Sequence, residues 1–598
     1  MFLRATIRKK DGKLHRYYSV VENRRLHSGK VAQRTVLYLG EINDSQEAAW
    51  RKTLDVFDEG GRGPTSLSLF PEDREIPADA VDAIQVKLSE MQLKHPRSFG
   101  DCWLACQIWQ RLGMTEFWND RLPIGREEVS WTKVLQLLVV NRLIDPGSEF
   151  RLHRQWFDRS AMDELLGVDF TVAEKDRLYR CLDRVLAHKK ELFLFLRDRW
   201  RNLFNTRFDI LLYDLTSTYF EGLAEQNPKA KRGYSRDSRP DCLQVVIALV
   251  VTTDGFPLAY EVMDGNTSDK TTLRGFLDKI EATYGKAERM WVMDRGIPTE
   301  ELLEEMRRPD RQTQYLVGTP RDRINVMEQR WLQLPWQKVR DSVEVKLWEE
   351  EGELFILAKS EGRRQKEMAI RRRRLVQYLR ALRRMRHSLP ARDQLMMRIG
   401  AAKSKAGRAA AFVRLYLPAE GEEVTRETFR FQLDREKFDK AELRDGHYLL
   451  RSNVTAGEPA VLWERYVQLT EIEAVFKTLK TDLAIRPVYH QKEYRVDAHI
   501  FVAFLAYCIM VTLKKRLQMH APGLTPKAVL EKLATIQMLD VWLPTSDGRY
   551  LVMSRYTQPE PDQLVLLRTL GLRLPDQPLP RIKNQRDSQM ATAVTPEM

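Results

Sequence analysis

Two aspartates stand where a carboxylate is poorly hydrated unless it has a partner. Asp214 follows the apolar run 208–213, and Asp294 follows the apolar run 290–293. A carboxylate at the end of a buried strand needs a metal ion, a cationic partner or hydrogen-bond donors. Either aspartate alone could cap the next turn through its side chain. Together, at the ends of neighbouring strands of one sheet, they favour a shared metal site.

A third acid lies on an expected helix over residues 464–480. Leu469, Glu473 and Lys480 follow Tyr466 by 3, 7 and 14 positions. At 3.6 residues per turn these side chains share one helix face. A stripe with an aromatic ring, a carboxylate and an ammonium group is not a simple core face. The alternative is a solvated helix with scattered charges.

The three acids, taken in order with their neighbours, resemble a known family. Asp, Asp, then Tyr-x2-Leu-x3-Glu-x6-Lys is similar to the DDE transposases of the insertion-sequence-four superfamily, and most similar to its sixteen-thirty-four branch. Many members have Arg where this chain has Leu469. Further similarity lies in the segments 214–219, 265–269, 294–296 and 485–490.

The resemblance implies an α/β fold with an RNase H-like core, a mixed five-stranded sheet and a β-rich insertion domain. It implies that Asp214, Asp294 and Glu473 are the catalytic residues and hold two Mg²⁺ ions, with Mn²⁺ as an alternative. Such a pair of ions supports phosphodiester hydrolysis and transesterification. The expected enzyme binds the terminal inverted repeats of an insertion sequence, cleaves the ends and joins them to target DNA. Its partners would be double-stranded DNA and a second copy of the chain.

Further residues are expected to contact DNA. By the resemblance, Tyr466 and Lys480 hold a phosphate near the transposon end, with Lys477 on the same helix. Arg295 either contacts phosphate or pairs with a carboxylate. The segment 363–386 has eleven basic residues and one acid, which favours a phosphate-tracking helix over a solvated helix packed by its leucines. Its central contacts would be Arg371, Arg372, Arg373 and Arg374.

Two tryptophans in the region of the expected insertion, Trp331 and Trp336, are candidates for stacking on a DNA base. Core packing is the alternative, and it is the interpretation that we favour for both.

The hydrophobic pattern divides the chain into seven parts. Strand-like runs, turn signals and three- to four-residue periodicity set the boundaries. We expect a small N-terminal β unit (1–56), a linker (57–97), a helical DNA-binding region (98–206), the first part of the catalytic core (207–320), an insertion domain with the basic helix (321–458), the second part of the core with the Glu473 helix (459–520), and a C-terminal region with a disordered tail (521–598).

Composition supports a polyanionic partner and no membrane span. The 598 residues include 98 Lys and Arg against 84 Asp and Glu, a net charge of +14. The apolar run 500–513 is shorter than the roughly 20 residues that span a bilayer, so we expect a buried helix. Five cysteines do not indicate a disulfide framework, and Cys102 and Cys106 are expected to pack. The expected location is the cytoplasm, with the nucleoid when DNA is bound.

Two other functions share these features. An RNase H-like nuclease without strand transfer needs the same acids but not the insertion or the Tyr466–Lys480 face. A DNA-binding protein from a decayed element needs no acids, and the presence of all three argues against it.

Overall fold

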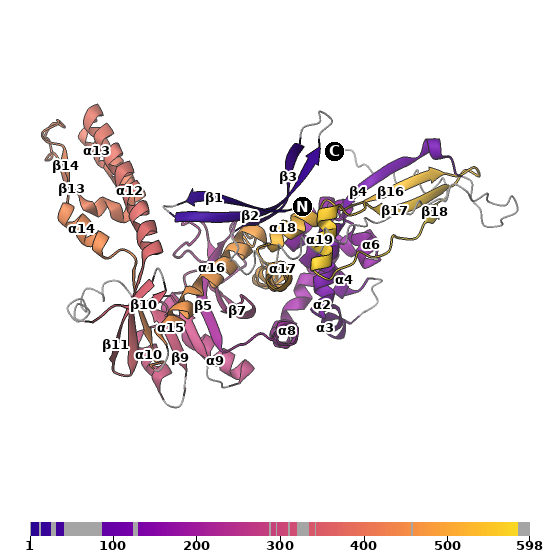
Figure 1. Cartoon of the computed structure of the whole chain (residues 1–598), viewed down its shortest axis with the longest axis horizontal. Helices are drawn as coiled ribbons and strands as arrows, with labels where there is room; N and C mark the ends of the chain where they lie inside the picture. The colour runs from indigo at the N-terminus through magenta and orange to yellow at the C-terminus, as the bar shows by residue number, and fades with distance from the viewer. Residues whose placement is uncertain are drawn as a thin grey trace. The chain divides into compact units, whose positions relative to one another are not determined.

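The computed structural model describes residues 2–10, 13–25, 31–40, 86–123, 129–285, 289–294, 296–308, 311, 313–319, 334–340, 343–455 and 458–583. Two compact units divide the chain. The first holds residues 1–6, 16–287 and 470–598, and the second holds residues 7–15 and 288–469. The fold is mixed α/β, as the sequence predicts (Figure 1).

The N-terminal residues form long strands. β1 (Phe2–Lys10) is followed by β2 (Lys13–Arg25), which pairs antiparallel with β3 (Val31–Gly40). Residues 41–85, with most of the expected linker, lie outside the described residues. The linker prediction fails at its end, because β4 (Gln92–Ser98) pairs antiparallel with β16 (Gln537–Pro544). The polar sequence of β4 does not alternate, and its partner lies more than 400 residues away, so no local pattern reveals this strand.

A helical region follows and packs around one long apolar helix. Its larger helices are α2 (Gly100–Arg111), α3 (Met114–Arg121), α4 (Trp131–Ile144), α7 (Lys175–Val185) and α8 (Lys189–Phe204), with short turns α5 (Glu149–Arg151) and α6 (Met162–Leu166). α17 (Glu493–His520) contacts α2, α4 and α7. Among the described residues, α17 alone is long and apolar enough to cross a membrane, but 94% of its most apolar window is buried. This burial confirms the core helix expected at 500–513.

The first unit contains a three-stranded antiparallel meander. β5 (Ile210–Tyr219) pairs with β6 (Gln244–Thr252), which pairs with β7 (Pro257–Asp264). β6 is buried along its whole length, as expected for a central strand. α9 (Leu273–Tyr284) packs on one face, where Phe276 contacts Tyr213 at 5.2 Å between ring centroids. α17 covers the other face, where Phe504 stacks on Tyr260 at 4.0 Å.

The second unit contains a larger mixed sheet. β8 (Met290–Met293) runs parallel to β9 (Gln314–Gly318), with α10 (Glu300–Arg307) between them in sequence. The sheet continues antiparallel from β9 through β15 (His447–Ser452), β12 (Glu353–Ser360), β11 (Val343–Glu350) and β10 (Gln337–Arg340). The five expected core strands all form, but the count of five is too low. β15 pairs antiparallel with β9 and is one of the additional strands.

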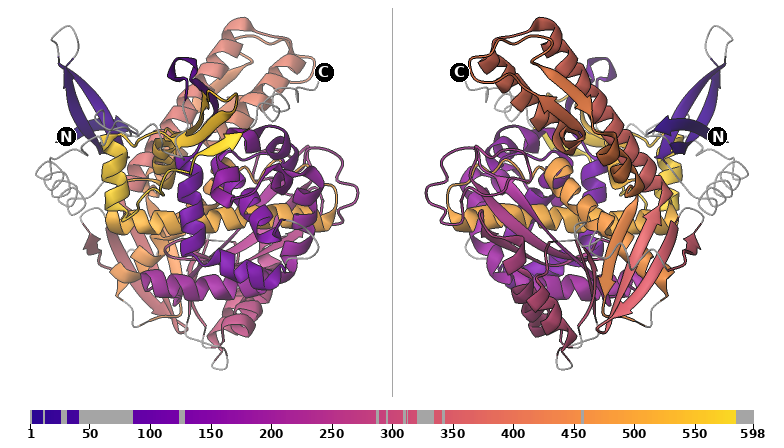
Figure 2. Two further views of the ribbon diagram at one scale, coloured as in Figure 1. Left: turned by 90° about the vertical axis from the view of Figure 1, so that its right-hand side faces the viewer. Right: turned by 90° about the vertical axis from the view of Figure 1, so that its left-hand side faces the viewer.

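The insertion is more helical than predicted. α12 (Glu361–Ser388) and α13 (Arg392–Ala406) lie side by side (Figures 1 and 2). The short strands β13 (Val413–Tyr416) and β14 (Arg430–Leu433) and the helix α14 (Arg435–Leu443) complete this part. Its own core includes Leu375, Tyr378, Leu382 and Phe429. The leucine stripe of the basic helix therefore packs, while many of its basic residues stay exposed.

The C-terminal region is largely ordered. α18 (Pro526–Leu533), β16, β17 (Tyr550–Tyr556) and α19 (Pro561–Thr569) follow α17. β18 (Arg581–Lys583) pairs with β17, inside the C-terminal tail that was expected to be disordered. Residues 584–598 lie outside the described residues.

Candidate active site

The sequence predicted Asp214 at the end of a strand. In the structure it lies within β5, which continues to Tyr219. The residues after it, Leu215 to Tyr219, include buried Thr216, Ser217 and Thr218, and the β-favouring Thr216, Thr218 and Tyr219 continue the strand. Asp214 is directly opposite Leu249, which is opposite Tyr260. Residues directly opposite in an antiparallel sheet share a face, so the half-buried Asp214 lies on the face that α17 covers.

Glu473 lies on α16 (Leu469–Lys477), on the exposed side of the helix. Ile472, Val475 and Phe476 form the buried side. Glu471, two positions before Glu473, pairs with Lys514 at 2.6 Å. Within the described part of the chain, Glu473 has no hydrogen bond or ion pair. Of the two carboxylates on this helix, the predicted one is available for a ligand.

The turn between β6 and β7 brings α16 and α17 together. Gly255 has φ +88°, which favours glycine, and a Cβ there would lie 3.1 Å from the Tyr507 hydroxyl and 3.8 Å from Val475 Cγ2. Tyr507 also donates a hydrogen bond to the Gly255 carbonyl at 2.8 Å. The Glu473 helix therefore packs beside α17 at this turn.

The expected helix over 464–480 is not continuous. α15 (Pro459–Val467) ends before Gln468, and α16 begins at Leu469. A π-helical turn then covers Thr478–Asp482. Wide turns of this kind shift the side chains that follow and are frequent at functional sites. Tyr466 and Lys480 therefore do not share an uninterrupted stripe with Glu473.

Lys480 is paired inside the protein. Its Nζ lies 2.7 Å from Asp237 Oδ1, and the side chains are 11% and 2% exposed. Arg486 donates to the same oxygen through Nη1. Burial lowers the pKa of Lys480, and Asp237 opposes that shift. The Arg486 side chain is 28% exposed, so its remaining N–H groups have access to solvent.

Sequence reasoning missed Asp237. The residue lies in the polar loop between β5 and β6, where Arg236 pairs with Asp269 at 2.5 Å. The 265–269 segment is held close to this loop, because a Cβ on Gly265 would lie 2.3 Å from the Lys231 carbonyl oxygen. The signal that could have revealed the site was the run of alternating charges from Arg236 to Asp241 in a loop.

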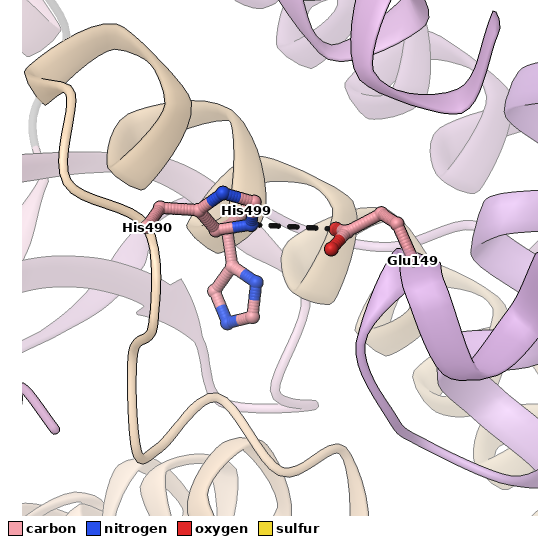
Figure 3. A group of neighbouring side chains, drawn as sticks. All are labelled: Glu149, His490 and His499. Carbon is pink, nitrogen blue, oxygen red and sulfur yellow. Dashed lines mark ion pairs between the residues drawn. The ribbon is translucent and has the colours of Figure 1, made fainter. Parts of the chain in front are cut away.

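A second polar cluster includes His490, which lies in the loop that follows Arg486. Glu149, His490 and His499 place one oxygen or nitrogen atom each within 4.8 Å of one another. His490 Nε2 faces Glu149 Oε1 at 3.4 Å (Figure 3). Burial alone would raise the pKa of Glu149, but its contact with His490 and the nearby His499 and Arg142 lower it to about 2.

This cluster does not fit a metal ion. The buried guanidinium of Arg142 lies 3.3 Å from His499 Nδ1 and supplies the cation that the cluster needs. Burial, with Arg142 nearby, lowers the pKa of His499 well below its usual value, which keeps that ring neutral. A divalent ion beside a buried guanidinium would be repelled. We interpret the cluster as a buried ion-pair network that ties α5 to α17.

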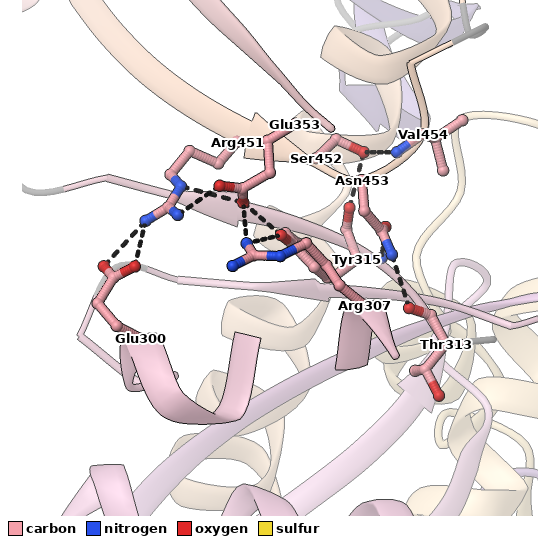
Figure 4. A network of polar contacts seen from close by, with 9 residues as sticks. All are labelled: Glu300, Arg307, Thr313, Tyr315, Glu353, Arg451, Ser452, Asn453 and Val454. Carbon is pink, nitrogen blue, oxygen red and sulfur yellow. Dashed lines mark hydrogen bonds and ion pairs between the residues drawn. The ribbon is translucent and has the colours of Figure 1, made fainter. Parts of the chain in front are cut away.

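Asp294 lies in the second unit, directly after β8, and is exposed. A partly buried network of ion pairs holds α10, the helix that follows Asp294 in sequence (Figure 4). Arg451 donates to Glu353 at 2.6 Å and to Glu300 of α10 at 2.9 Å. Glu353 also forms an ion pair with Arg307 at 3.0 Å. The network ties α10, which follows Asp294, to strands β12 and β15.

The other residues expected to contact DNA have different surroundings in the structure. Tyr466, in the second unit, packs against Tyr448 and Trp463. Lys477 is exposed on α16. Arg295 and Trp331 lie outside the described residues. Trp336 is 36% exposed and contacts Lys346 at 4.8 Å from the ring centroid. The grouping of Asp214 and Glu473 with Asp294 stays a prediction.

The four arginines of the basic helix differ in their surroundings. Arg371 donates to Asp445 at 2.8 Å, and both side chains are at least 90% buried. Arg372 pairs with Glu442 at 2.9 Å while remaining exposed. Arg373 and Arg374 are exposed and have no carboxylate partner among the described residues. Only this last pair presents free charge, so Arg371 holds α12 in place and is not available to DNA.

Comparison with known proteins assigns the family. The family of the transposase DDE domain matches residues 206–509, and the N-terminal domain of the IS1634 family transposases matches residues 3–56. No curated protein matches the chain. One similar solved structure is the piggyBac transposase synaptic complex with hairpin DNA, at a TM-score of 0.33 and 9% identity, over 74% of this chain and 82% of that one. That likeness is too distant to support an inference. Because the DDE domain covers more than half of the chain, the protein belongs to the DDE transposases, in agreement with the IS1634 branch.

Proposed function

We propose that this transposase binds the terminal inverted repeats of an insertion sequence, cleaves the element ends and joins them to target DNA. The observation that carries the proposal is the position of the three acids within the matched DDE domain. Asp214 lies on β5, Asp294 directly follows β8, and Glu473 lies on α16. A strand, a strand end and a helix supply the acids in the order expected for an RNase H-like core.

The donor set fits hard divalent cations. Asp214, Asp294 and Glu473 offer only carboxylate oxygens, which Mg²⁺ and Mn²⁺ prefer. Glu473 is exposed and has no partner among the described residues. Two such ions activate an attacking oxygen, stabilise a leaving oxygen and neutralise phosphate charge. Asp214, Asp294 and Glu473 would together hold these ions.

Arg486 supplies the phosphate contact that was expected of Lys480. Lys480 is nearly buried and is engaged by Asp237, whereas Arg486 shares the same carboxylate oxygen and keeps four further N–H groups. A guanidinium matches phosphate geometry better than an ammonium group does. In the proposed complex Asp237 orients Arg486, and Arg486 holds a phosphate beside the Glu473 helix.

Other charged groups position the double-stranded DNA. The pair Arg373 and Arg374 on α12 and the exposed Lys477 on α16 would contact backbone phosphates. Phosphate contacts fix the register of the duplex without reading its sequence. Two element ends must be cut together, so we propose that two copies of the chain act on them. The DNA substrate places this activity at the nucleoid, in the cytoplasm.

The Glu473 helix offers a matched test of the proposal. Purified protein is incubated with Mg²⁺ and labelled DNA that carries the element's own end. Glu473→Gln should abolish strand-specific cutting, since it removes a charged ligand. Glu471→Gln removes the same charge two positions away and should keep most of the activity. Equal activity of the two variants would contradict the assignment of Glu473.

A further inference from the structure

A basic cavity in the first unit has none of the three acids in its lining and has no assigned role. Its volume is about 590 Å³, within the range of pockets that hold small ligands. Lys175 and Arg180 of α7 line one side, and Tyr489, His490 and Lys492 line the other. These segments are more than 300 residues apart in sequence, so the cavity is formed by tertiary packing.

The cavity is strongly cationic. Lys175, Arg180, Lys492 and Arg495 line it, against the single carboxylate of Asp176. Arg495 is paired with Asp183 at 3.1 Å. The other three cations are exposed and form no ion pair within the described part of the chain. Unpaired cations around a concave surface attract a polyanion.

An exposed aromatic ring stands beside these charges. The Tyr489 side chain is 62% exposed, although the residues before it are fixed. Val488 N–H donates to the Tyr219 carbonyl at 2.9 Å, and Glu221 N–H donates to the Val488 carbonyl at 3.0 Å. His490, next in sequence, is held by Glu149. Tyr489 is therefore presented from a rigid stem and not from a loose loop.

The combination of unpaired cations and a rigid exposed ring is typical of surfaces that bind an unpaired nucleic-acid strand. The cations contact backbone phosphates, and bases stack on the ring. The stem of Tyr489 joins β5 at Tyr219, five residues after Asp214, a span of about 17 Å along the strand. One DNA segment can therefore contact both places.

We propose that this cavity binds an unpaired stretch of the DNA strand that the transposase handles. Lys175, Arg180 and Lys492 hold its phosphates, and a base stacks on Tyr489. The proposal rests on the proposed function only in taking DNA as the substrate. It gives the helical region 98–206 a defined contact with DNA through α7.

Binding can be measured without catalysis. The full chain, without divalent metal, is titrated against a fluorescent oligo(dT) of eight nucleotides at several salt concentrations. The variant Arg180→Gln/Lys492→Gln should reduce the slope of log affinity against log salt by about 1.4, since each phosphate contact contributes about 0.7. The control Lys87→Gln/Arg573→Gln loses the same charge at exposed positions outside the cavity and should keep the wild-type slope.

Stacking is tested at Tyr489. Tyr489→Ala should weaken oligo(dT) binding about fivefold or more, the effect of losing one stacked base. Tyr489→Phe should restore binding, because the ring is kept. The cavity and control variants change four exposed residues, Arg180, Lys492, Lys87 and Arg573. Melting temperatures equal to that of the wild type would show that these variants are folded.

Each outcome decides something. Failure of the wild type to bind oligo(dT), or an equal loss in the control variant, overturns the inference. If the cavity variant loses binding to duplex DNA but keeps binding to oligo(dT), the assignment of an unpaired strand is overturned. The end-cleavage assay separates the two proposals. If the wild type cuts the element end and the cavity variants bind oligo(dT) as the wild type does, only the cavity proposal is refuted. If the cavity variants lose oligo(dT) binding and the wild type never cuts, only the proposed reaction is refuted.

Discussion

Asp237 should be energetically coupled to Lys480, and the coupling can be measured without DNA. Asp237→Asn keeps the shape of the side chain and removes its charge. The carboxylate is 2% exposed and its Lys480 partner 11% exposed, with the two atoms 2.7 Å apart. Removing one member of a buried pair costs about 3–5 kcal/mol, because the other charge stays buried and unpaired. We expect a loss of about 3 kcal/mol, since the amide oxygen still accepts one hydrogen bond.

The double variant identifies the cause of that loss. Lys480→Met alone leaves Asp237 paired with Arg486 and should cost less, about 1.5–3 kcal/mol for one charged hydrogen bond. In Asp237→Asn/Lys480→Met no ammonium group is left unpaired. Its destabilisation should therefore be smaller than the sum of the two single effects, by at least about 1 kcal/mol.

The assay is urea unfolding of the full chain, followed by tryptophan fluorescence. The free-energy change of each variant is taken from the shift in midpoint at unchanged slope. A matched control is Lys514→Met, which removes an ammonium group from the half-exposed pair with Glu471 and should cost about 1 kcal/mol or less. Additive effects of the Asp237 and Lys480 changes would refute the ion pair, and Lys480 would return as a phosphate contact.

Three further predictions concern other contacts. Glu353→Ala should lower the free energy of unfolding by about 3 kcal/mol, because the buried Arg451 keeps only Glu300 and the partly exposed Arg307 loses its carboxylate; urea midpoints measure this, and a loss under 1 kcal/mol would contradict it. Glu149 has a pKa of about 2 against an ordinary 4.5, so its charge should contribute about 3 kcal/mol above pH 4.5 and lose that contribution as the pH falls toward 2. The stability difference from Glu149→Gln should shrink over that range, and a constant difference would argue against the pairing. Arg373→Gln/Arg374→Gln should reduce the salt slope of duplex binding by about 1.8, whereas Arg371→Gln should destabilise α12 and keep the slope; equal slopes for both would contradict the distinction.

Much of the fold could be predicted because its elements carry local patterns. The continuous apolar run of 500–513 indicated a buried helix, and α17 is one. The strands before Asp214 and Asp294 were found from their apolar runs. β4 and β18 were missed because their sequences are polar and their partners are supplied by tertiary structure. The pairing of β15 with β9 also has no sequence signal.

The candidate site was predictable in its residue types but not in its pairings. Spacing alone put Lys480 on the face of Glu473, whereas the π-helical turn Thr478–Asp482 and the loop carboxylate of Asp237 engage it. Arg371 and Arg373 are indistinguishable in a run of four arginines. Only the position of Asp445, more than 70 residues later, separates a buried ion pair from a free charge.

The central claim is that three acids form one site that cuts and joins DNA. The most direct measurement is a combined cleavage and joining assay with Mg²⁺, in which a labelled element end is offered together with target DNA. We predict that the wild type cuts one strand at the end and transfers its 3′-hydroxyl to the target, and that Asp294→Ala does neither while keeping DNA binding. Cutting by Asp294→Ala at the wild-type rate, or binding without cutting by the wild type, would contradict the account.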